Sequence, residues 1–317
     1  MTDEVRHHEA KGRRFELRPY RDALFEDLYA LHSATFKPAV SMSALRAKYD
    51  CAPLGRSPCS TIAYEAGIPV AFHGALPYPV RIQGQRSWVG HSCDYITAPQ
   101  CRRLGLHSQL AQLSLDLMRR QGMVGAFAMF SEVSGAASVK MGWRLIDGLQ
   151  RFHLASGGAR WGHRVWRAPG LGALYRRHVE RQLRPWLTER GALVNPLCND
   201  GVAVDYAADY LSWKRYGGSQ MLSIAGATVW VRVAGRIAVG AAEGLDETNL
   251  EEVIARLRGI ARRCGVSEVM FQVSGGTRLF DVLAQAAPAH SSYAVGILPF
   301  NDAFDGILLN YGDFDTY

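Results

Sequence analysis

The chain has 317 residues, 48% of them hydrophobic, which is enough apolar surface for one large core or, as we predict, two smaller ones. Its six cysteines lie far apart and form no C-x-x-C pair, so they indicate neither a zinc site nor a disulfide framework and fit a reducing cytoplasm. The charged start "MTDEVRHHEAKGRR" and the lack of any run near the ~20 apolar residues of a membrane span predict a soluble, cytoplasmic protein without a transmembrane segment.

Three strands are predicted in the first third of the chain. The stretch "TIAYEAGIPVAFHGALPYPVRIQGQRSWVGHSCDYITAP" consists of β-rich runs that break at Ala66-Gly67 and at Gln83-Gly84. Each run is long enough to cross a sheet, so we expect an antiparallel meander. His73 lies in an apolar run of this stretch, and we expect it to be a buried, hydrogen-bonded side chain.

The pattern changes to helical after Gly105. Leu106, Leu110, Leu113 and Leu117 recur at helical spacing and form one apolar stripe, and the helix is expected to stop at Gly122. The apolar run "MVGAFAMFS" then predicts a buried strand, and "SGAASVKMGWRLID" predicts a short helix, a turn and another strand.

The net charge of +7 is concentrated in one segment. Residues 160–190 hold eight arginines against two glutamates, which is +6, with tryptophans at 161, 166 and 186 between them. Such a composition suits nucleic acid, an anionic lipid surface or a phosphorylated ligand. It also suits a solvated basic helix that joins two domains.

The second half repeats the outline of the first half faintly. "ALRAKYD" has an echo in "YLSWKRYG", and "AGIPVAFHGA" has one in "AGRIAVGAAEG", which makes an internal duplication plausible. "ETNLEEVIARLRGIARRCG" predicts a helix with Leu250, Ile254, Leu257 and Ala261 on one face, followed by the strand "VSEVMFQVS".

The stretch "TAPQCRRLGLHSQL", Thr97 to Leu110, places a proline, two arginines and a glycine directly before the first of these helices. A helix start offers unpaired N–H groups and the positive end of the helix dipole, and a glycine lets the backbone approach a ligand closely. Together these features favour a bound pyrophosphate. The second half has no counterpart of this loop.

This stretch resembles the cofactor motif of the GNAT superfamily of N-acyltransferases, V-x-P followed by R-x-x-G-x-G/A and a helix. Thr97 and Pro99 match the V-x-P, and the six loop positions are filled by Arg102, Arg103, Leu104, Gly105, Leu106 and His107. "FSEVSGAASVKMGW" resembles the second signature of the family, on Ser131, Ser134, Lys140, Gly142 and Trp143. "LNYGDFDTY" and "YLSWKRY" resemble tandem-domain members that modify cell-surface amino sugars.

The resemblance implies an α/β (α+β) fold of two tandem GNAT-like domains, each a mixed, mostly antiparallel sheet flanked by helices, the second degenerate. The expected divisions are a catalytic domain over residues 1–155, a basic helical linker over 156–200 and a second, acceptor-shaping domain over 201–317. Acyl-coenzyme A is the implied co-substrate, and no metal is expected. The residues expected to bind it are Tyr95, Ile96, Thr97, Arg102, Arg103, Leu104, Gly105, Leu106, His107, Ser108, Ser131 and Ser134.

The acceptor amine must lose a proton, so a base is expected near the strand "GHSCDYIT", which resembles the thioester-facing strand of the family. Asp94 and His91 are the candidates, and strict alternation points them to opposite faces unless a bulge intervenes. Glu132 is a third candidate. Ser138 stands where many members carry the tyrosine that protonates the thiolate, so its hydroxyl or water would take that role. Cys93 and Cys101 are expected to be packing residues.

The predicted function is transfer of an acyl group from acyl-coenzyme A to an amine, on a nucleotide-linked amino sugar used in cell-surface polysaccharide synthesis. The anionic part of this acceptor would contact the basic segment through Arg176, Arg177 and Arg181. Two alternatives stay open: a peptidoglycan ligase that uses aminoacyl-transfer RNA, against which the intact loop argues, and a non-catalytic acyl-coenzyme A sensor. No nucleic-acid partner is expected.

Overall fold

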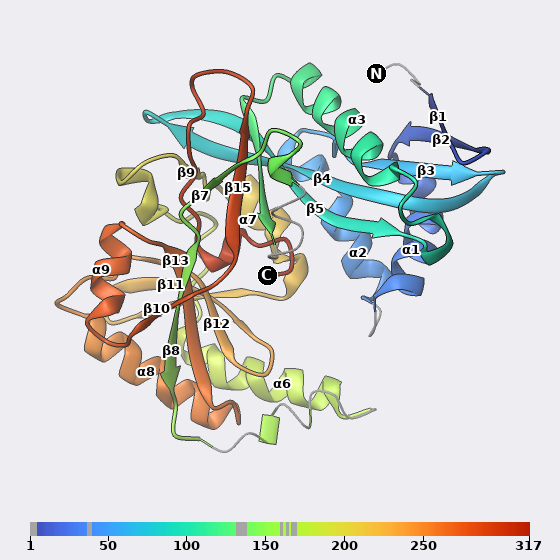
Figure 1. Ribbon diagram of the computed structural model, residues 1–317. Helices are drawn as coiled ribbons and strands as arrows, with labels where there is room; N and C mark the ends of the chain where they lie inside the picture. The colour runs from blue at the N-terminus through green and yellow to red at the C-terminus, as the bar shows by residue number, and fades with distance from the viewer. Residues whose placement is uncertain (1–4, 37–39, 131–137, 159–160, 163–164, 166–169) are drawn as a thin grey trace. The chain divides into compact units, whose positions relative to one another are not determined.

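The computed structural model describes residues 5–36, 40–130, 138–158, 161–162, 165 and 170–317. They form two compact units, each with its own sheet (Figure 1). The first unit comprises Met1–Ile146 and Val295–Gly306, and the second comprises Asp147–Ala294 and Ile307–Tyr317. Within the described ranges, no helix is both long enough and apolar enough to cross a membrane.

The sheet of the first unit has the strand order β1-β2-β3-β4-β5-β6-β15-β7. Neighbouring strands from β1 to β5 are antiparallel, β5 and β6 are parallel, and β15 is antiparallel to β7. The strands are β1 (Arg6–Ala10), β2 (Arg13–Pro19), β3 (Thr61–Glu65), β4 (Ile68–Ile82), β5 (Gln85–Thr97), β6 (Gly125–Phe130), β7 (Arg144–Ile146) and β15 (Ala294–Pro299). The helices are α1 (Phe25–Thr35), α2 (Met42–Tyr49) and α3 (Leu106–Arg120).

The predicted meander is confirmed as β3, β4 and β5. Both breaks fall where the sequence placed them, because Ala66, Gly67, Gln83 and Gly84 all have positive φ, between 48° and 80°. Two such residues in succession make the two-residue turn whose twist matches that of the flanking strands. The turn residues therefore set the first pairs of each hairpin, Glu65 with Ile68 and Ile82 with Gln85.

The helices cover opposite faces of this sheet (Figure 1). Neighbouring residues of a strand point to opposite faces of the sheet, and Ala71 and Phe72 are neighbours on β4. Ala71 packs in one cluster with Leu106 and Leu110 of α3. The centroid of the Phe72 ring instead lies 5.4 Å from that of Tyr49 of α2. The four predicted leucines of α3 are all buried. The helix continues to Arg120, two residues before Gly122, as its apolar period predicted.

The sheet of the second unit has the order β10-β11-β12-β13-β8-β14. Its strands are β8 (Leu149–Ala155), β10 (Gln220–Ile224), β11 (Ala227–Val233), β12 (Ile237–Glu243), β13 (Glu268–Ser274) and β14 (Ala289–Ser291). The short β9 (Ala203–Val204) also falls in the second unit but is not part of this sheet. Its helices are α6 (Gly172–Leu183), α7 (Ala208–Lys214), α8 (Leu250–Arg263) and α9 (Arg278–Ala284). The predicted apolar face of α8 is buried at all four positions.

The two units share one local topology. In the first unit, β4 and β5 are antiparallel, and α3 connects β5 to the parallel strand β6. In the second unit, β11 and β12 are antiparallel, and α8 connects β12 to the parallel strand β13. A parallel neighbour requires a crossover connection, which is a helix in both cases. The units are therefore consistent with the predicted tandem arrangement.

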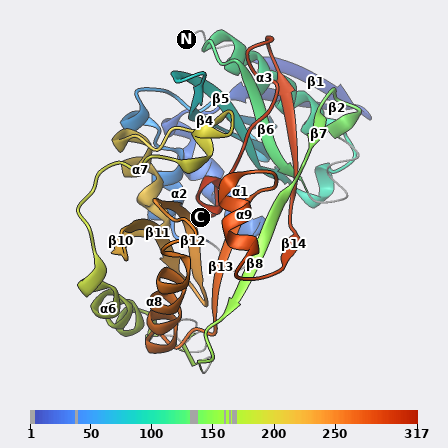
Figure 2. The ribbon, with the colours of Figure 1, turned by 90° about the vertical axis from the view of Figure 1, so that its left-hand side faces the viewer.

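The structure divides the chain at other residues than the sequence predicted. Strand β8, at the end of the expected first domain, pairs with β13 in the second sheet, while Val295–Gly306 returns to the first unit. The expected linker contains α6, whose Tyr175, Val179 and Leu183 are buried in the core of the second unit, beside α8 (Figure 2). These exchanges depend on pairing between distant segments, which local patterns do not show.

Candidate functional site

The chain turns sharply between β5 and α3. Arg103 and Gly105 both have positive φ, 61° and 78°, and Gly105 is the residue directly before the helix. The first helical bond runs from Gln109 N to Gly105 O at 3.2 Å. The three residues before Gln109 are Leu106, His107 and Ser108. Their N–H groups have no acceptor within the helix, because the helix contains no carbonyl one turn before them. The turn therefore presents amides at the positive end of a helix of 15 residues.

Contacts from the neighbouring strands hold this turn in place. His8 Nε2 lies 2.7 Å from Leu104 O, and Arg13 Nη1 donates to Gln100 O at 2.8 Å. Arg13 also forms a two-bond ion pair with Glu65, at 2.6 Å from Nε and 2.5 Å from Nη2, which lowers the pKa of Glu65. The side chains of Arg102 and Arg103 remain exposed. The backbone is thus fixed while two cationic side chains stay available to a ligand.

A buried polar chain lies beneath the start of α3. His73 bonds to Ser114 Oγ through Nδ1 at 2.8 Å and to Ser92 Oγ through Nε2 at 3.1 Å, as the expectation of a buried, bonded histidine required. Burial lowers the pKa of His73 to about 3, so this imidazole is neutral near pH 7. The Tyr95 ring stacks on His73 at 4.7 Å and meets His107 at 4.5 Å. His107 thus packs against the predicted thioester strand, and desolvation lowers its pKa.

Strands β5 and β6 separate halfway along β5. Their described pairing runs from Gly90–Ala126 to Ser92–Ala128, whereas β5 stays paired with β4 as far as Thr97–Ala71. Beyond Ser92, the described residues of β5 no longer pair with β6. The backbone N–H and C=O groups on that edge of β5 can therefore bond to a ligand.

Asp94 lies in a bulge just past this separation. The register of β4 against β5 shifts between His73 and Gly74, so that Cys93 and Tyr95 are paired and Asp94 is the extra residue, with φ of 43°. An extra residue redirects its side chain relative to strict alternation. The bulge that the sequence analysis left open is therefore present at Asp94.

Two side chains from α2 bond to this carboxylate. Lys48 Nζ donates to Asp94 Oδ2 at 2.5 Å, and Tyr49 OH donates to the same oxygen at 2.7 Å. Among the residues that the structure describes, no donor reaches Oδ1. Gly74 provides the room, since a Cβ there would lie 2.4 Å from Tyr49 OH and 2.8 Å from Cys93 O. Both bonds are made to Oδ2, so the carboxylate is fixed through that oxygen.

A histidine completes this cluster. His32 of α1 is buried, and burial lowers its pKa, while the charges of Asp94 and Lys48 act on it in opposite directions. The sequence analysis missed His32, Lys48 and Tyr49 as site residues. It had singled out "ALRAKYD" only as one half of a repeat, and a gap of 46 residues separates Lys48 from Asp94. Only the packing of α2 on β4 and β5 brings them together.

The sequence profile of the acetyltransferase (GNAT) domain matches residues 16–146. Residues 16–146 are a GNAT acetyltransferase domain. The prediction of an enzyme, an acyl-coenzyme A-dependent N-acyltransferase of acetyltransferase type, is confirmed at the level of this domain. The match spans β5, the turn and α3, which are the elements that the resemblance had singled out.

Solved structures share the fold of the whole chain. A GCN5-related N-acetyltransferase from Kribbella flavida is 13% identical, with 93% of this chain and 71% of that chain covered and a TM-score of 0.59. A probable N-acyltransferase from Enterococcus faecalis is 12% identical, with 89% and 72% covered and a TM-score of 0.59. A fungal β-N-acetylglucosaminidase that contains a glucosamine N-acetyltransferase region is 12% identical, with 92% and 38% covered and a TM-score of 0.50. No curated protein matches the chain in sequence. The predicted fold class is confirmed.

The other base candidate of the GNAT domain lies in different surroundings. His91 is buried between aromatic rings, stacked on Phe127 at 4.5 Å with an interplanar angle of 5° and edge-on to Tyr78 at 5.0 Å. It is thus part of an aromatic layer, whereas Asp94 lies in the bulge. This contrast favours Asp94 over His91 as the group that meets an acceptor.

The second signature of the GNAT domain is only partly described. Ser131, Glu132 and Ser134 lie outside the described residues. Ser138 is buried, and its carbonyl accepts bonds from Met141 N at 2.9 Å and Trp143 N at 3.2 Å. Trp143 is itself buried and packs edge-on against Phe130 at 5.4 Å. The roles predicted for these residues stay predictions.

The predicted acceptor arginines lie on α6 of the second unit. Arg176, Arg177 and Arg181 are exposed and lie outside the buried row of Tyr175, Val179 and Leu183. Arg160, Arg164 and Arg167 lie outside the described residues. The basic segment therefore presents at least these three cations to solvent, and their contact with an acceptor stays a prediction.

The second unit has an acidic turn where the GNAT domain has its basic one. The connection from β12 to α8 contains Asp246 and Glu247, and Glu251 and Glu252 follow in the first turn of the helix. Asp246 Oδ1 accepts from Thr248 N at 2.9 Å and from Thr248 Oγ1 at 2.6 Å, and these bonds lower its pKa. The carboxylates at this helix start already interact with the positive end of the helix dipole, and they would repel a bound anion there. This turn does not suit a pyrophosphate.

Proposed function

We propose that the chain transfers an acyl group from acyl-coenzyme A to the primary amine of a nucleotide-linked amino sugar, in the synthesis of a cell-surface polysaccharide. The proposal rests on one observation: strand β5 carries the bulged carboxylate of Asp94 where β6 departs, and it leads within a few residues into the amide-rich turn before α3. A carboxylate and an anion cradle on one strand suit a thioester bound between them.

The turn would hold the pyrophosphate of coenzyme A. Its amides from Leu104 to Ser108 would form the cradle, those of Leu106 to Ser108 at the start of α3, and the exposed side chains of Arg102 and Arg103 would add charge-assisted hydrogen bonds. Tyr95, Ile96 and Thr97 would lie along the pantetheine arm, on the edge of β5 that no longer pairs with β6. A backbone N–H of this edge would stabilise the oxyanion of the tetrahedral intermediate.

Asp94 would bind and orient the acceptor. Its Oδ2 is held by Lys48 and Tyr49, which fixes the carboxylate, and its Oδ1 would accept a hydrogen bond from the amine. As the nitrogen attacks, the C–N bond forms and the amine proton passes to Asp94; when the tetrahedral intermediate collapses, the C–S bond breaks and the thiolate leaves. The thiolate takes its proton from water or from the Ser138 hydroxyl. No covalent enzyme intermediate is needed.

Fewer observations support an amino sugar as the acceptor. The glucosamine N-acetyltransferase region named for the fungal neighbour acts on such an amine, but the likeness is one of fold. The exposed arginines of α6 would contact the diphosphate of a nucleotide-linked acceptor. An acceptor without an anionic group would form no ion pair with these arginines.

The test is direct acyl transfer. The protein is incubated with a panel of acyl-coenzyme A donors and of amines that includes nucleotide-linked amino sugars, and thiol release and product mass are followed. We expect thiol release that depends on the amine, with one acyl group added to it. Asp94→Asn should lower kcat strongly, and Asp302→Asn, an exposed aspartate of the same unit, should not. Coenzyme A binding without turnover of any amine would contradict the proposal and favour a sensor.

A further inference from the structure

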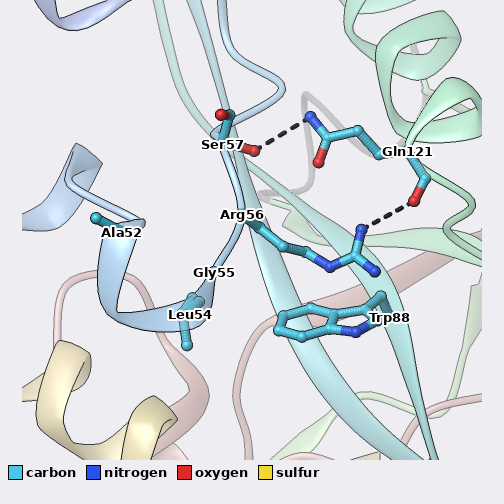
Figure 3. A pocket seen from close by; sticks show the side chains of 7 residues that line it. All are labelled: Ala52, Leu54, Gly55, Arg56, Ser57, Trp88 and Gln121. Carbon is cyan, nitrogen blue, oxygen red and sulfur yellow. Dashed lines mark hydrogen bonds between the residues drawn. The ribbon is translucent and has the colours of Figure 1, made fainter.

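A cavity of about 590 Å³ lies in the first unit beside the segment that joins α2 to β3 (Figure 3). Trp88 comes from β5, Gln121 directly follows α3, and the other lining residues come from the joining segment. The lining residues are Ala52, Leu54, Gly55, Arg56, Ser57, Trp88 and Gln121. None of them belongs to the turn before α3 or to the cluster around Asp94, so the cavity is separate from the site described above.

The guanidinium of Arg56 is fixed in the wall of this cavity. Its central carbon lies 4.3 Å from the centroid of the Trp88 indole, and Nη1 donates to Gln121 O at 2.8 Å (Figure 3). Gln121 Nε2 in turn donates to Ser57 O at 3.2 Å, which ties α3 to the joining segment. An arginine held by stacking and by one bond has already lost much of its rotamer freedom. A ligand that binds to it therefore meets a preorganised group.

Among the residues that the structure describes, the positive charge of Arg56 has no acidic partner. Within the described ranges it forms no ion pair, although it is half-buried, and burial lowers the pKa of this arginine. The nearby charge of Arg86, whose guanidinium carbon lies 5.2 Å from the same indole, acts in the same direction. A partly desolvated cation beside a second cation is stabilised by a bound anion.

A second cavity of about 570 Å³ shares Ala52, Arg56 and Ser57 with the first. Its walls also carry Asp22 and Asp50 together with Arg21 and Arg46. Arg46 pairs there with Asp22 at 2.9 Å. Asp22 and Asp50 offset Arg21 and Arg46 in the second cavity, so the positive charge of Arg56, which lines both cavities, is the one left over.

We propose that the first cavity binds a small molecule through a phosphate or carboxylate group, with Arg56 as the main ligand-binding residue. The guanidinium edge that does not face Gln121 would take two oxygens of the anion. The carbon part of the ligand would lie against Leu54 and Trp88. This site goes beyond acyl transfer, since neither coenzyme A nor the acceptor amine is needed to define it.

The experiment is calorimetric titration of the full chain with inorganic phosphate in one arm and acetate in the other, at constant ionic strength. Arg56→Gln should raise the dissociation constant of the preferred anion at least 10-fold, because a charge-assisted, two-bond contact is lost. Arg56→Lys, which keeps the charge but loses the planar fork, should weaken binding less. Arg81→Gln is the matched control, an arginine of the β4–β5 hairpin that bonds to Gly84 O, and it should change nothing.

A second measurement needs no variant. The Nε–H signal of Arg56 in the NMR spectrum of the unaltered protein should shift on titration and saturate with the calorimetric constant. It thus tests the proposal even if Arg56→Gln unfolds. The proposal is overturned if neither anion gives saturable binding, or if Arg56→Gln and Arg81→Gln weaken binding equally.

Discussion

Replacing Lys48 by methionine should destabilise the first unit by about 3 kcal/mol. The side chains of Lys48 and Asp94 are only 9% and 12% exposed, so the substitution leaves a carboxylate almost without water and with one of its two donors removed. Breaking a buried pair from one side costs about 3 to 5 kcal/mol, and the slight exposure of this pair places it at the lower end. Methionine matches lysine in length and helix propensity, so α2 itself should persist.

The assay is urea unfolding at pH 7, followed by circular dichroism. The matched control is Arg144→Met, which breaks the ion pair with Asp305 in the same unit, where the side chains are 51% and 88% exposed. An exposed pair is worth about 0 to 1 kcal/mol, so this control should change little. The double variant Lys48→Met with Asp94→Asn should lose less than the sum of the single variants, because neither charge then remains unpaired. A loss below about 1 kcal/mol for Lys48→Met, no larger than that of the control, would refute the assignment of a buried, coupled pair.

Three further predictions concern the turn, the acceptor and the second unit. Replacing Arg102 by glutamate or Gly105 by valine should raise the dissociation constant of coenzyme A ~10-fold or more, and unchanged calorimetric affinity in folded variants would remove the turn from the site. Reversing the charges of Arg176, Arg177 and Arg181 together should raise KM for an anionic acceptor without changing coenzyme A affinity, and titration should give one coenzyme A per chain; indifferent acceptor kinetics or two bound molecules would contradict this. Burial raises the pKa of Asp313 to about 7 from its ordinary 3.8, so the folded chain holds a proton that the unfolded chain loses between about pH 4 and 7. Stability should therefore be greatest below this window and fall as pH rises through it, and Asp313→Asn should flatten the fall; an unchanged slope in that variant would assign it to another group.

Local sequence determined the elements around the site. Pairs of residues with positive φ end β3 and β4 at the two turns that the sequence predicted. The leucine spacing of α3 predicted its buried face and its start after Gly105. The pattern of arginine and glycine before α3 was visible because every group of the turn lies within a few residues of the others. Such features need only neighbouring residues, so one segment of sequence is sufficient to predict them.

Distant segments decided the rest. Alternation along β5 gave Asp94 and His91 opposite faces, and the one-residue bulge that redirects Asp94 arises from its register against β4, which β5 alone does not encode. Lys48 and Tyr49 reach Asp94 because α2 packs on that face of the sheet, where the Tyr49 ring contacts Phe72. Gly74 leaves room there for the tyrosine hydroxyl. The return of Val295–Gly306 to the first unit and the burial of α6 in the second likewise depend on which distant surfaces pack together. Periodicity shows which face of an element is apolar, but the partner of that face is chosen by packing in three dimensions, and the chemistry at Asp94 depends on that choice.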